Sequence, residues 1–230
     1  MCNIPNVTLG GKMSIQHKTI HVNDIVVPAI EMSSNSDKIA MVIHGYGGNK
    51  EEIMGLSSYL YFNGVDSITI DLRGHGESTD DYSIRVLDDI NELLEKYGDN
   101  KKTIAIGHSL GGRLALLSKA DLKIGISPAL SKTYSEQTKA MIKNFRSYRV
   151  IEESQEINFE ILQQLDEITM GNNLVLYGTR DIPEIIKACE QLQGPGMRIE
   201  KIKDALHNDI YVNYSVFNII AEFIHTAPGE

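Results

Sequence analysis

The sequence predicts an α/β fold in which helices cover both faces of a mainly parallel sheet. Short apolar segments typical of buried strands alternate with amphipathic helical segments along most of the 230 residues, and glycine-rich polar turns follow several of the strands. Strand–helix–strand units form right-handed crossovers, which place neighbouring strands parallel. At this length, folding buries roughly 70% of the unfolded surface, enough for one sizeable core.

The first two strands are predicted to form a hairpin. The runs 15–22 and 25–32 flank Asn23-Asp24, and both of these turn residues tolerate the left-handed conformation of tight turns. The alternation then continues along the chain. The further predicted strands are 39–43, 67–70, 103–106, 123–126, 173–177 and 197–202.

Helices are predicted where apolar residues recur at a spacing of three to four, with glycine after several of them. They are 51–62, 82–97, 110–119 and 183–192. A final helix is expected to bury one apolar face. The residues of that face are Val212, Val216, Ile219, Ile220 and Phe223.

Residues 128–171, called the insertion below, interrupt the alternation. Their apolar residues have helical spacing among many charges, and some 40 residues are too many for a plain loop. We therefore predict one domain, 1–230, with 128–171 as a helical insertion over the carboxyl edge of the sheet. Its large apolar side chains suggest a partly apolar pocket. They are Tyr134, Met141, Phe145, Tyr148 and Phe159.

Composition argues against several function classes. The chain has 22 Lys and Arg against 31 Asp and Glu, a net charge of −9, so it lacks the positive field that gathers nucleic acid or anionic lipid. Cys2 and Cys189 are too few for a disulfide framework. No apolar run is long enough for a membrane span, and residues 1–18 contain no apolar segment of the kind found in a secretory signal peptide. A cytoplasmic location is expected, and the oligomeric state stays open.

The strongest chemical signal is Gly107-His108-Ser109-Leu110-Gly111, between a strand and a helix. A sharp turn there lifts the Ser109 hydroxyl above the sheet edge in a strained conformation. The residues two before and two after it, Gly107 and Gly111, come so close together that both must lack bulk. The helix that follows points free N–H groups at a developing anion. This motif predicts a nucleophilic serine.

A second signal, His44-Gly45-Tyr46-Gly47-Gly48, follows the first parallel strand. The backbone N–H groups of Tyr46 and Leu110 are predicted to form a two-donor oxyanion hole. Two alternatives are a plain glycine turn and a phosphate cradle, although the lysine spacing of a P-loop is missing.

A nucleophilic serine needs a base, and the base needs an orienting acid. Asp181 follows the apolar strand 173–177, and His207 follows the last strand, so the order is serine, acid, base. Asp181 could instead cap the helix that begins near Pro183. Asp204 and Asp209 are alternative orienting acids. No pair of histidines has the His-Glu-x-x-His spacing, so no metal dependence is expected. A serine, a base and an acid need no cofactor for this chemistry, so none is expected.

These motifs resemble those of the α/β-hydrolase superfamily, together with the stretch Asp71-Leu72-Arg73-Gly74-His75-Gly76-Glu77-Ser78. The resemblance covers nearly the whole chain and is nearest to small carboxylesterases, monoacylglycerol-lipase-like enzymes and feruloyl esterases. It implies an eight-stranded sheet, a Ser109/Asp181/His207 triad and a short lid formed by the insertion.

The predicted function is that of a serine hydrolase that cleaves a small-molecule carboxylic ester through an acyl-enzyme. The alternatives are an acyl thioesterase that uses the same triad, and a non-catalytic binding protein that retains the fold.

Overall fold

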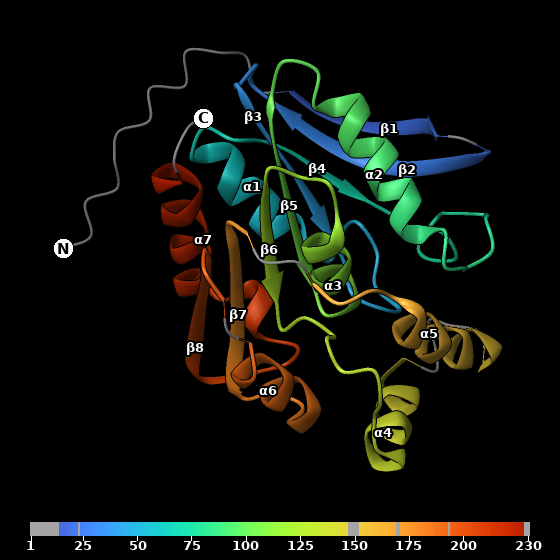
Figure 1. Ribbon diagram of the computed structural model, residues 1–230. Helices are drawn as coiled ribbons and strands as arrows, with labels where there is room; N and C mark the ends of the chain where they lie inside the picture. The colour runs from blue at the N-terminus through green and yellow to red at the C-terminus, as the bar shows by residue number, and fades with distance from the viewer. Residues whose placement is uncertain (1–13, 23, 147–151, 169–170, 193, 228–230) are drawn as a thin grey trace.

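A computed structural model describes residues 14–22, 24–146, 152–168, 171–192 and 194–227 (Figure 1). It contains an eight-stranded sheet with the strand order β1-β2-β4-β3-β5-β6-β7-β8. The strands are β1 Ser14–Val22, β2 Ile25–Ser33, β3 Lys38–Ile43, β4 Asp66–Ile70, β5 Lys102–His108, β6 Leu122–Ile126, β7 Asn173–Arg180 and β8 Met197–Leu206. The pairs β1–β2 and β2–β4 are antiparallel, and the other pairs are parallel. The predicted mostly parallel sheet is therefore confirmed.

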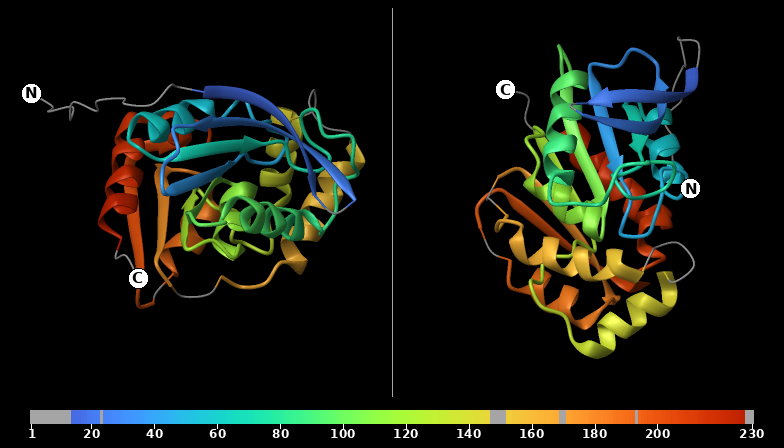
Figure 2. Two further views of the ribbon diagram at one scale, coloured as in Figure 1. Left: turned by 90° about the horizontal axis from the view of Figure 1, so that it is seen from above. Right: turned by 90° about the vertical axis from the view of Figure 1, so that its right-hand side faces the viewer.

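Helices cover both faces of the sheet, as Figure 2 shows from above. The helices are α1 Met54–Phe62, α2 Val86–Tyr97, α3 Leu110–Leu117, α4 Glu136–Arg146, α5 Glu152–Gln164, α6 Pro183–Glu190 and α7 Tyr214–Thr226, with a 3₁₀ turn at Ile210–Val212. In β3, Ile39 and Met41 pack in the cluster with α2 and α3, whereas Ala40 and Val42 pack in the cluster with α1 and α7. This alternation is the two-residue period of a strand buried on both faces.

The chain after β6 forms α4 and α5 before it returns to the sheet as β7. Figure 1 shows these two helices beyond the carboxyl ends of the parallel strands. The helical character and the position predicted for 128–171 are therefore present. Reactive groups gather at this edge in open α/β sheets, so the insertion lies where a site is expected.

Several predicted bounds differ from the observed ones, as for the first helix, which begins at Met54 and not at residue 51. The second helix begins at Val86 and not at residue 82, because the Tyr82 side chain is held before it by the Tyr46 ring and by Asn158. Val212 is 56% exposed and does not belong to the buried face of α7. It lies in the 3₁₀ turn, and Asn213 starts a separate helix by accepting a hydrogen bond from the Ser215 N–H, which breaks the helical register.

None of the described helices is both long enough and apolar enough to span a membrane.

Candidate active site

The turn between β5 and α3 holds Ser109 in a rare backbone conformation. Its φ is 55° and its ψ is −113°, in a region that side-chain-bearing residues seldom occupy. A Cβ on Gly107 would overlap the carbonyl of Gly111, and a Cβ on Gly111 would overlap the backbone of β3 at Ile43. The close approach expected from the two glycines is thus present, and it leaves Ser109 partly exposed above the strand.

The three residues chosen from the sequence lie in hydrogen-bonding succession. The Nδ1 of His207 is 2.8 Å from Oδ1 of Asp181, and its Nε2 is 3.1 Å from the Ser109 Oγ. An ionised carboxylate can only accept, so Nδ1 carries the proton in this arrangement and Nε2 of the neutral ring can accept from the serine hydroxyl. The succession joins the carboxyl ends of β5, β7 and β8.

Asp181 is a buried carboxylate that is stabilised as an anion. Burial alone would raise its pKa, but the hydrogen bonds from His207, Ser127 and the Ile182 N–H outweigh burial and hold the pKa below its ordinary value. The helix that follows begins without a side-chain cap, so Asp181 does not perform the capping function considered from the sequence.

The alternative acids have other contacts. The backbone N–H of Asp204 donates to Thr179, and the Asp204 residue is exposed. The carboxylate of Asp209 accepts from the Leu206 N–H at 2.8 Å. Asp181 is therefore the carboxylate that meets the His207 ring.

Two further residues, Ser127 and His108, hold Asp181 and His207 in place. The sequence did not indicate this role for either of them. Ser127, directly after β6, donates its hydroxyl to Oδ2 of Asp181 and has a φ of 47°. The Nε2 of His108 donates to the carbonyl of His207 at 2.8 Å, and the two rings lie 4.7 Å apart. Ser127 could have been noticed as a polar residue at a strand end, but its partner lies 54 positions away.

The glycine-rich loop after β3 lies against Ser109. The Gly48 N–H donates to the Gly45 carbonyl at 2.9 Å, which closes a tight turn, and Gly47 has a φ of 71°. A Cβ on Gly45 would be 3.1 Å from the His108 Nδ1 and 3.2 Å from the Ser109 Cβ, so a side chain there would be tightly packed against the Ser109 turn. Leu110 is the first residue of α3, so its N–H has no partner within the helix.

His44 braces this loop. Its Nδ1 donates to the Gly45 carbonyl at 2.8 Å, and its Nε2 accepts from the Leu72 N–H at 3.1 Å. The ring is fully buried, so the imidazole serves as a fixed link between the loop and the chain after β4.

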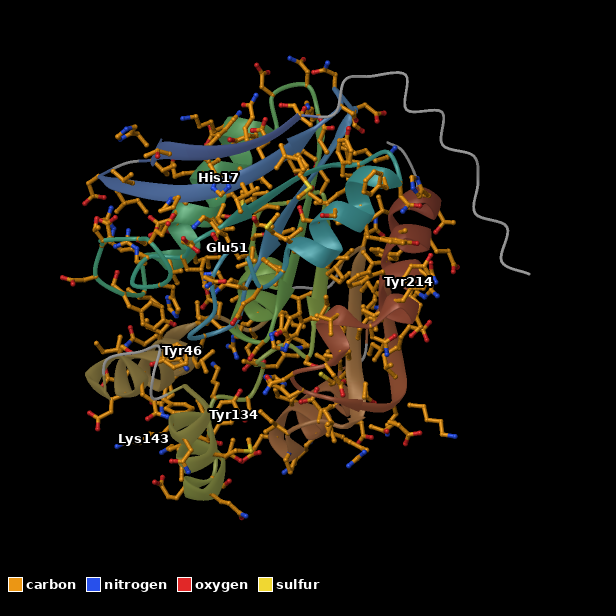
Figure 3. The ribbon with its side chains drawn as sticks, turned by 180° about the vertical axis from the view of Figure 1, so that it is seen from behind. His17, Tyr46, Glu51, Tyr134, Lys143 and Tyr214 are labelled. Carbon is orange, nitrogen blue, oxygen red and sulfur yellow. The ribbon has the colours of Figure 1, made fainter. Side chains whose placement is uncertain are left out.

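A mainly apolar cavity of about 460 Å³ opens beside Ser109 and His207. Tyr46 and Leu110 line it, as do Tyr134, Met141 and Phe159 from the predicted pocket. Tyr148 lies outside the described residues, and the Phe145 side chain is not described. Figure 3 shows Tyr46 and Tyr134 next to α4 and α5, between these helices and the sheet. A size of this order suits a small organic ligand.

The insertion is tied to the rest of the site through two tyrosines. The Tyr46 hydroxyl lies 2.7 Å from the Ser154 hydroxyl, and the Tyr82 hydroxyl donates to Asn158 at 2.9 Å. Both partners lie on α5. Within the described part of the chain, no group of three or more His, Cys, Asp or Glu residues could hold a metal ion.

Comparison with known proteins matches residues 41–120 to a family model described as the alpha/beta hydrolase fold. No curated protein matches the chain. An esterase from Pyrococcus furiosus is 18% identical with a TM-score of 0.72, and the match covers 94% of this chain and 92% of that one.

Two further solved structures are similar over nearly their whole length. Est1E from Butyrivibrio proteoclasticus, solved with ferulic acid bound, is 19% identical with a TM-score of 0.68 and covers 90% of this chain and 98% of its own. A monoglyceride lipase from Saccharomyces cerevisiae is 14% identical with a TM-score of 0.68, over 95% and 96% of the two chains. The chain therefore has the fold of the α/β hydrolases.

Proposed function

We propose that the protein is a serine hydrolase that cleaves a carboxylic ester through an acyl-enzyme intermediate. The observation that carries the proposal is the position of the His207 ring, 2.8 Å from the Asp181 carboxylate and 3.1 Å from the Ser109 hydroxyl, beside an apolar cavity. A base within hydrogen-bond reach of a hydroxyl and oriented by an acid is the arrangement that activates a serine.

In the first half of the reaction, the Ser109 Oγ attacks the ester carbonyl while Nε2 of His207 takes the hydroxyl proton. The carbonyl oxygen becomes an oxyanion, for which the N–H groups of Tyr46 and Leu110 are the donors. When the intermediate collapses, the bond to the alcohol oxygen breaks, and His207 gives its proton to the departing alcohol. The acyl group is now an ester of Ser109.

In the second half, His207 takes a proton from water, and the hydroxyl oxygen attacks the acyl carbonyl. Collapse of this second intermediate breaks the bond to the Ser109 Oγ, and His207 returns the proton to it, so that the carboxylic acid is released. Asp181 holds the Nδ1–H tautomer of His207 throughout and stabilises the imidazolium that forms in each half.

The insertion is proposed to act as a lid over the acyl group. Ile142, Phe159 and Leu162 belong to it and line the cavity together with Ser109. Apolar walls favour an acyl or alcohol group with substantial hydrocarbon surface, because each buried methylene contributes about 0.8 kcal/mol.

The test is a comparison of the wild type with Ser109→Ala on p-nitrophenyl esters and with a fluorophosphonate probe. We expect the wild type to turn over the esters and to be labelled. The Ala variant should lose labelling, and its kcat should fall by up to about 10⁶-fold, because triad members act as a unit.

Control variants separate this proposal from its alternatives. Ser118→Ala removes a buried hydroxyl at the far end of α3, where it bonds the Ala115 carbonyl, and should leave labelling intact. A wild type that resists the probe and turns over no ester would contradict the proposal and favour a binding protein. Faster turnover of acyl thioesters than of the matched oxygen esters would instead favour a thioesterase.

A further inference from the structure

A buried arginine lies one helical turn after the nucleophile. Arg113 on α3 is only 2% exposed, and its guanidinium donates to four backbone carbonyls. The acceptors and their distances are Ala129 at 3.3 Å, Leu130 at 2.7 Å, Leu165 at 2.9 Å and Asp166 at 3.0 Å.

These four carbonyls belong to the two ends of the insertion. Residues 129–130 follow β6 and lead into α4, and residues 165–166 come directly after α5 ends at Gln164. One terminal nitrogen of the guanidinium serves the first pair, and the other serves the second. A single side chain therefore joins both ends of the segment that carries α4 and α5.

The partners of Arg113 differ from those of a typical buried arginine. The comparably buried Arg73 forms a two-fold ion pair with Asp89, at 2.6 and 2.8 Å. Among the described residues, Arg113 forms no ion pair with a carboxylate, and burial lowers its pKa. The four carbonyls compensate the buried charge, together with the attraction of the nearby Glu167 and Asp166 carboxylates in the insertion. The charge is therefore fully stabilised only while both ends of the insertion are in place.

The same network reaches the nucleophile's backbone. The Ser109 carbonyl accepts from the Arg113 N–H at 3.1 Å and from the Ala129 N–H at 2.9 Å. Ala129, at the first end of the insertion, is thus bonded to the Ser109 carbonyl through its N–H and to the Arg113 guanidinium through its C=O. The position of the cavity wall and the position of the nucleophile are fixed by one connected set of bonds.

We propose that Arg113 is a positioning residue that clasps both ends of the insertion to α3 and thereby sets the selectivity of the site for large acyl groups. The clasp holds Ile142, Phe159 and Leu162 at a fixed distance from Ser109. An acetyl group is too small to need that wall, whereas a long acyl chain depends on it. The statement about selectivity rests on the proposed ester hydrolysis, but the statement about the clasp does not.

The experiment compares Arg113→Lys and Arg113→Met with Arg73→Lys and Arg73→Met. Arg73 is the matched control, because it is also buried, at 6% exposure, but is bonded to α2 and not to the insertion. A lysine keeps the charge but cannot divide two donor nitrogens between two chain segments. Each variant is assayed with p-nitrophenyl acetate and p-nitrophenyl octanoate, and amide hydrogen exchange is followed in α4, α5 and the sheet.

For Arg113→Lys we expect kcat/KM for the octanoate to fall by about 10-fold or more, mainly through KM, and kcat/KM for the acetate to fall much less. Amide exchange should become faster in α4 and α5 and stay unchanged in β5 and β6. The Arg73 variants should lower kcat/KM equally for both esters, and amide exchange around α2 should become faster. Arg113→Met should exaggerate the same pattern if it folds.

Unchanged exchange in α4 and α5 of Arg113→Lys would overturn the clasp. If Arg113→Lys lost kcat/KM equally for the two esters, the proposed effect of Arg113 on acyl selectivity would be wrong. If the wild type hydrolyses neither ester, the proposed function fails, and the exchange measurement still decides whether Arg113 holds the insertion.

Discussion

Ser109 and Ser127 have backbone conformations that side-chain-bearing residues rarely adopt, with φ values of 55° and 47°. Each costs about 1–2 kcal/mol relative to an ordinary conformation. Ser109 gains a partly exposed hydroxyl at the turn, and Ser127 aims its hydroxyl at Asp181. At this scale, the strained residues after β5 and β6 orient the groups proposed to react.

Two substitutions of Ser127 separate the effect of its backbone strain from the effect of its hydrogen bond to Asp181. Ser127→Ala keeps the Cβ and loses the hydroxyl, whereas Ser127→Gly loses both but accepts the positive φ. We expect kcat to fall by about 10-fold in both variants with little change in KM, because the Asp181 carboxylate loses one of its restraints. In thermal or urea unfolding, the Gly variant should be about 1 kcal/mol more stable than the Ala variant. Wild-type kcat in Ser127→Ala would show that the hydroxyl does not position Asp181.

The sequence placed Ser109, Asp181 and His207 at one edge of the sheet, because each follows a predicted strand and parallel strands end at one edge. The structure brings these three side chains within hydrogen-bonding distance. The sequence could not select Ser127, His108 or Arg113 for their positions. Their partners are distant in the chain, as the 99 positions between His108 and the His207 carbonyl illustrate. Such pairs depend on how strands are ordered in the sheet, which local patterns do not encode.

The turn between β5 and α3 depends on close approach of two elements. A Cβ on Gly107 would overlap the Gly111 carbonyl, which cannot move without displacing the first turn of α3. By contrast, Gly55 on α1 has an exposed position with only the Phe217 ring in ordinary contact, at 3.9 Å. The same substitution should therefore have opposite effects in the two elements.

Gly107→Ala should lower the free energy of unfolding by about 3 kcal/mol or more and abolish fluorophosphonate labelling, because overpacking displaces the turn. Gly55→Ala should raise the free energy of unfolding by roughly 0.5 kcal/mol, because alanine loses less conformational entropy in a helix. Urea unfolding of both variants measures the difference. A Gly107→Ala protein as stable as the wild type would show that the turn between β5 and α3 can accommodate a methyl group at residue 107.

At the scale of the whole molecule, a buried carboxylate links several strands at the amino end of the parallel sheet. Asp66, the first residue of β4, accepts from Lys101 before β5 at 2.8 Å and from the Ser34 N–H at 2.7 Å. Burial alone would raise its pKa, but the hydrogen bonds from Lys101, Ser34 and Ser36 together hold it below the ordinary value of 3.8. Ser33 donates to the same carboxylate.

This shift gives stability a defined dependence on pH. The folded state binds the Asp66 proton less tightly than the unfolded state, so the contribution is complete above the ordinary pKa of 3.8 and is lost as the pH falls from there through the folded-state pKa. The lowered pKa of Asp181 acts in the same direction. The free energy of unfolding should therefore decrease with acidification below about pH 4.

Asp66→Asn tests this contribution. At pH 7 the variant should be less stable than the wild type by about 3 kcal/mol, because Lys101 loses its buried partner. The difference should shrink when urea unfolding is repeated near pH 3. Asp37→Asn, at a side chain that is 84% exposed, should match the wild type at both values. If Asp66→Asn lowered the free energy of unfolding equally at the two pH values, the Asp66 carboxylate would not be the source of this pH dependence.

The sequence by itself determined the alternation of strands and helices, the turn around Ser109, and the candidates proposed as acid and base, because period, glycine spacing and strand ends are local properties of the chain. The tertiary structure alone decided the start of α2 at Val86, the exposure of Val212, and the bonds of Ser127 and Arg113. These depend on which segments pack together. A buried polar group must find its partner wherever the fold supplies one, and that partner is often far away in the chain.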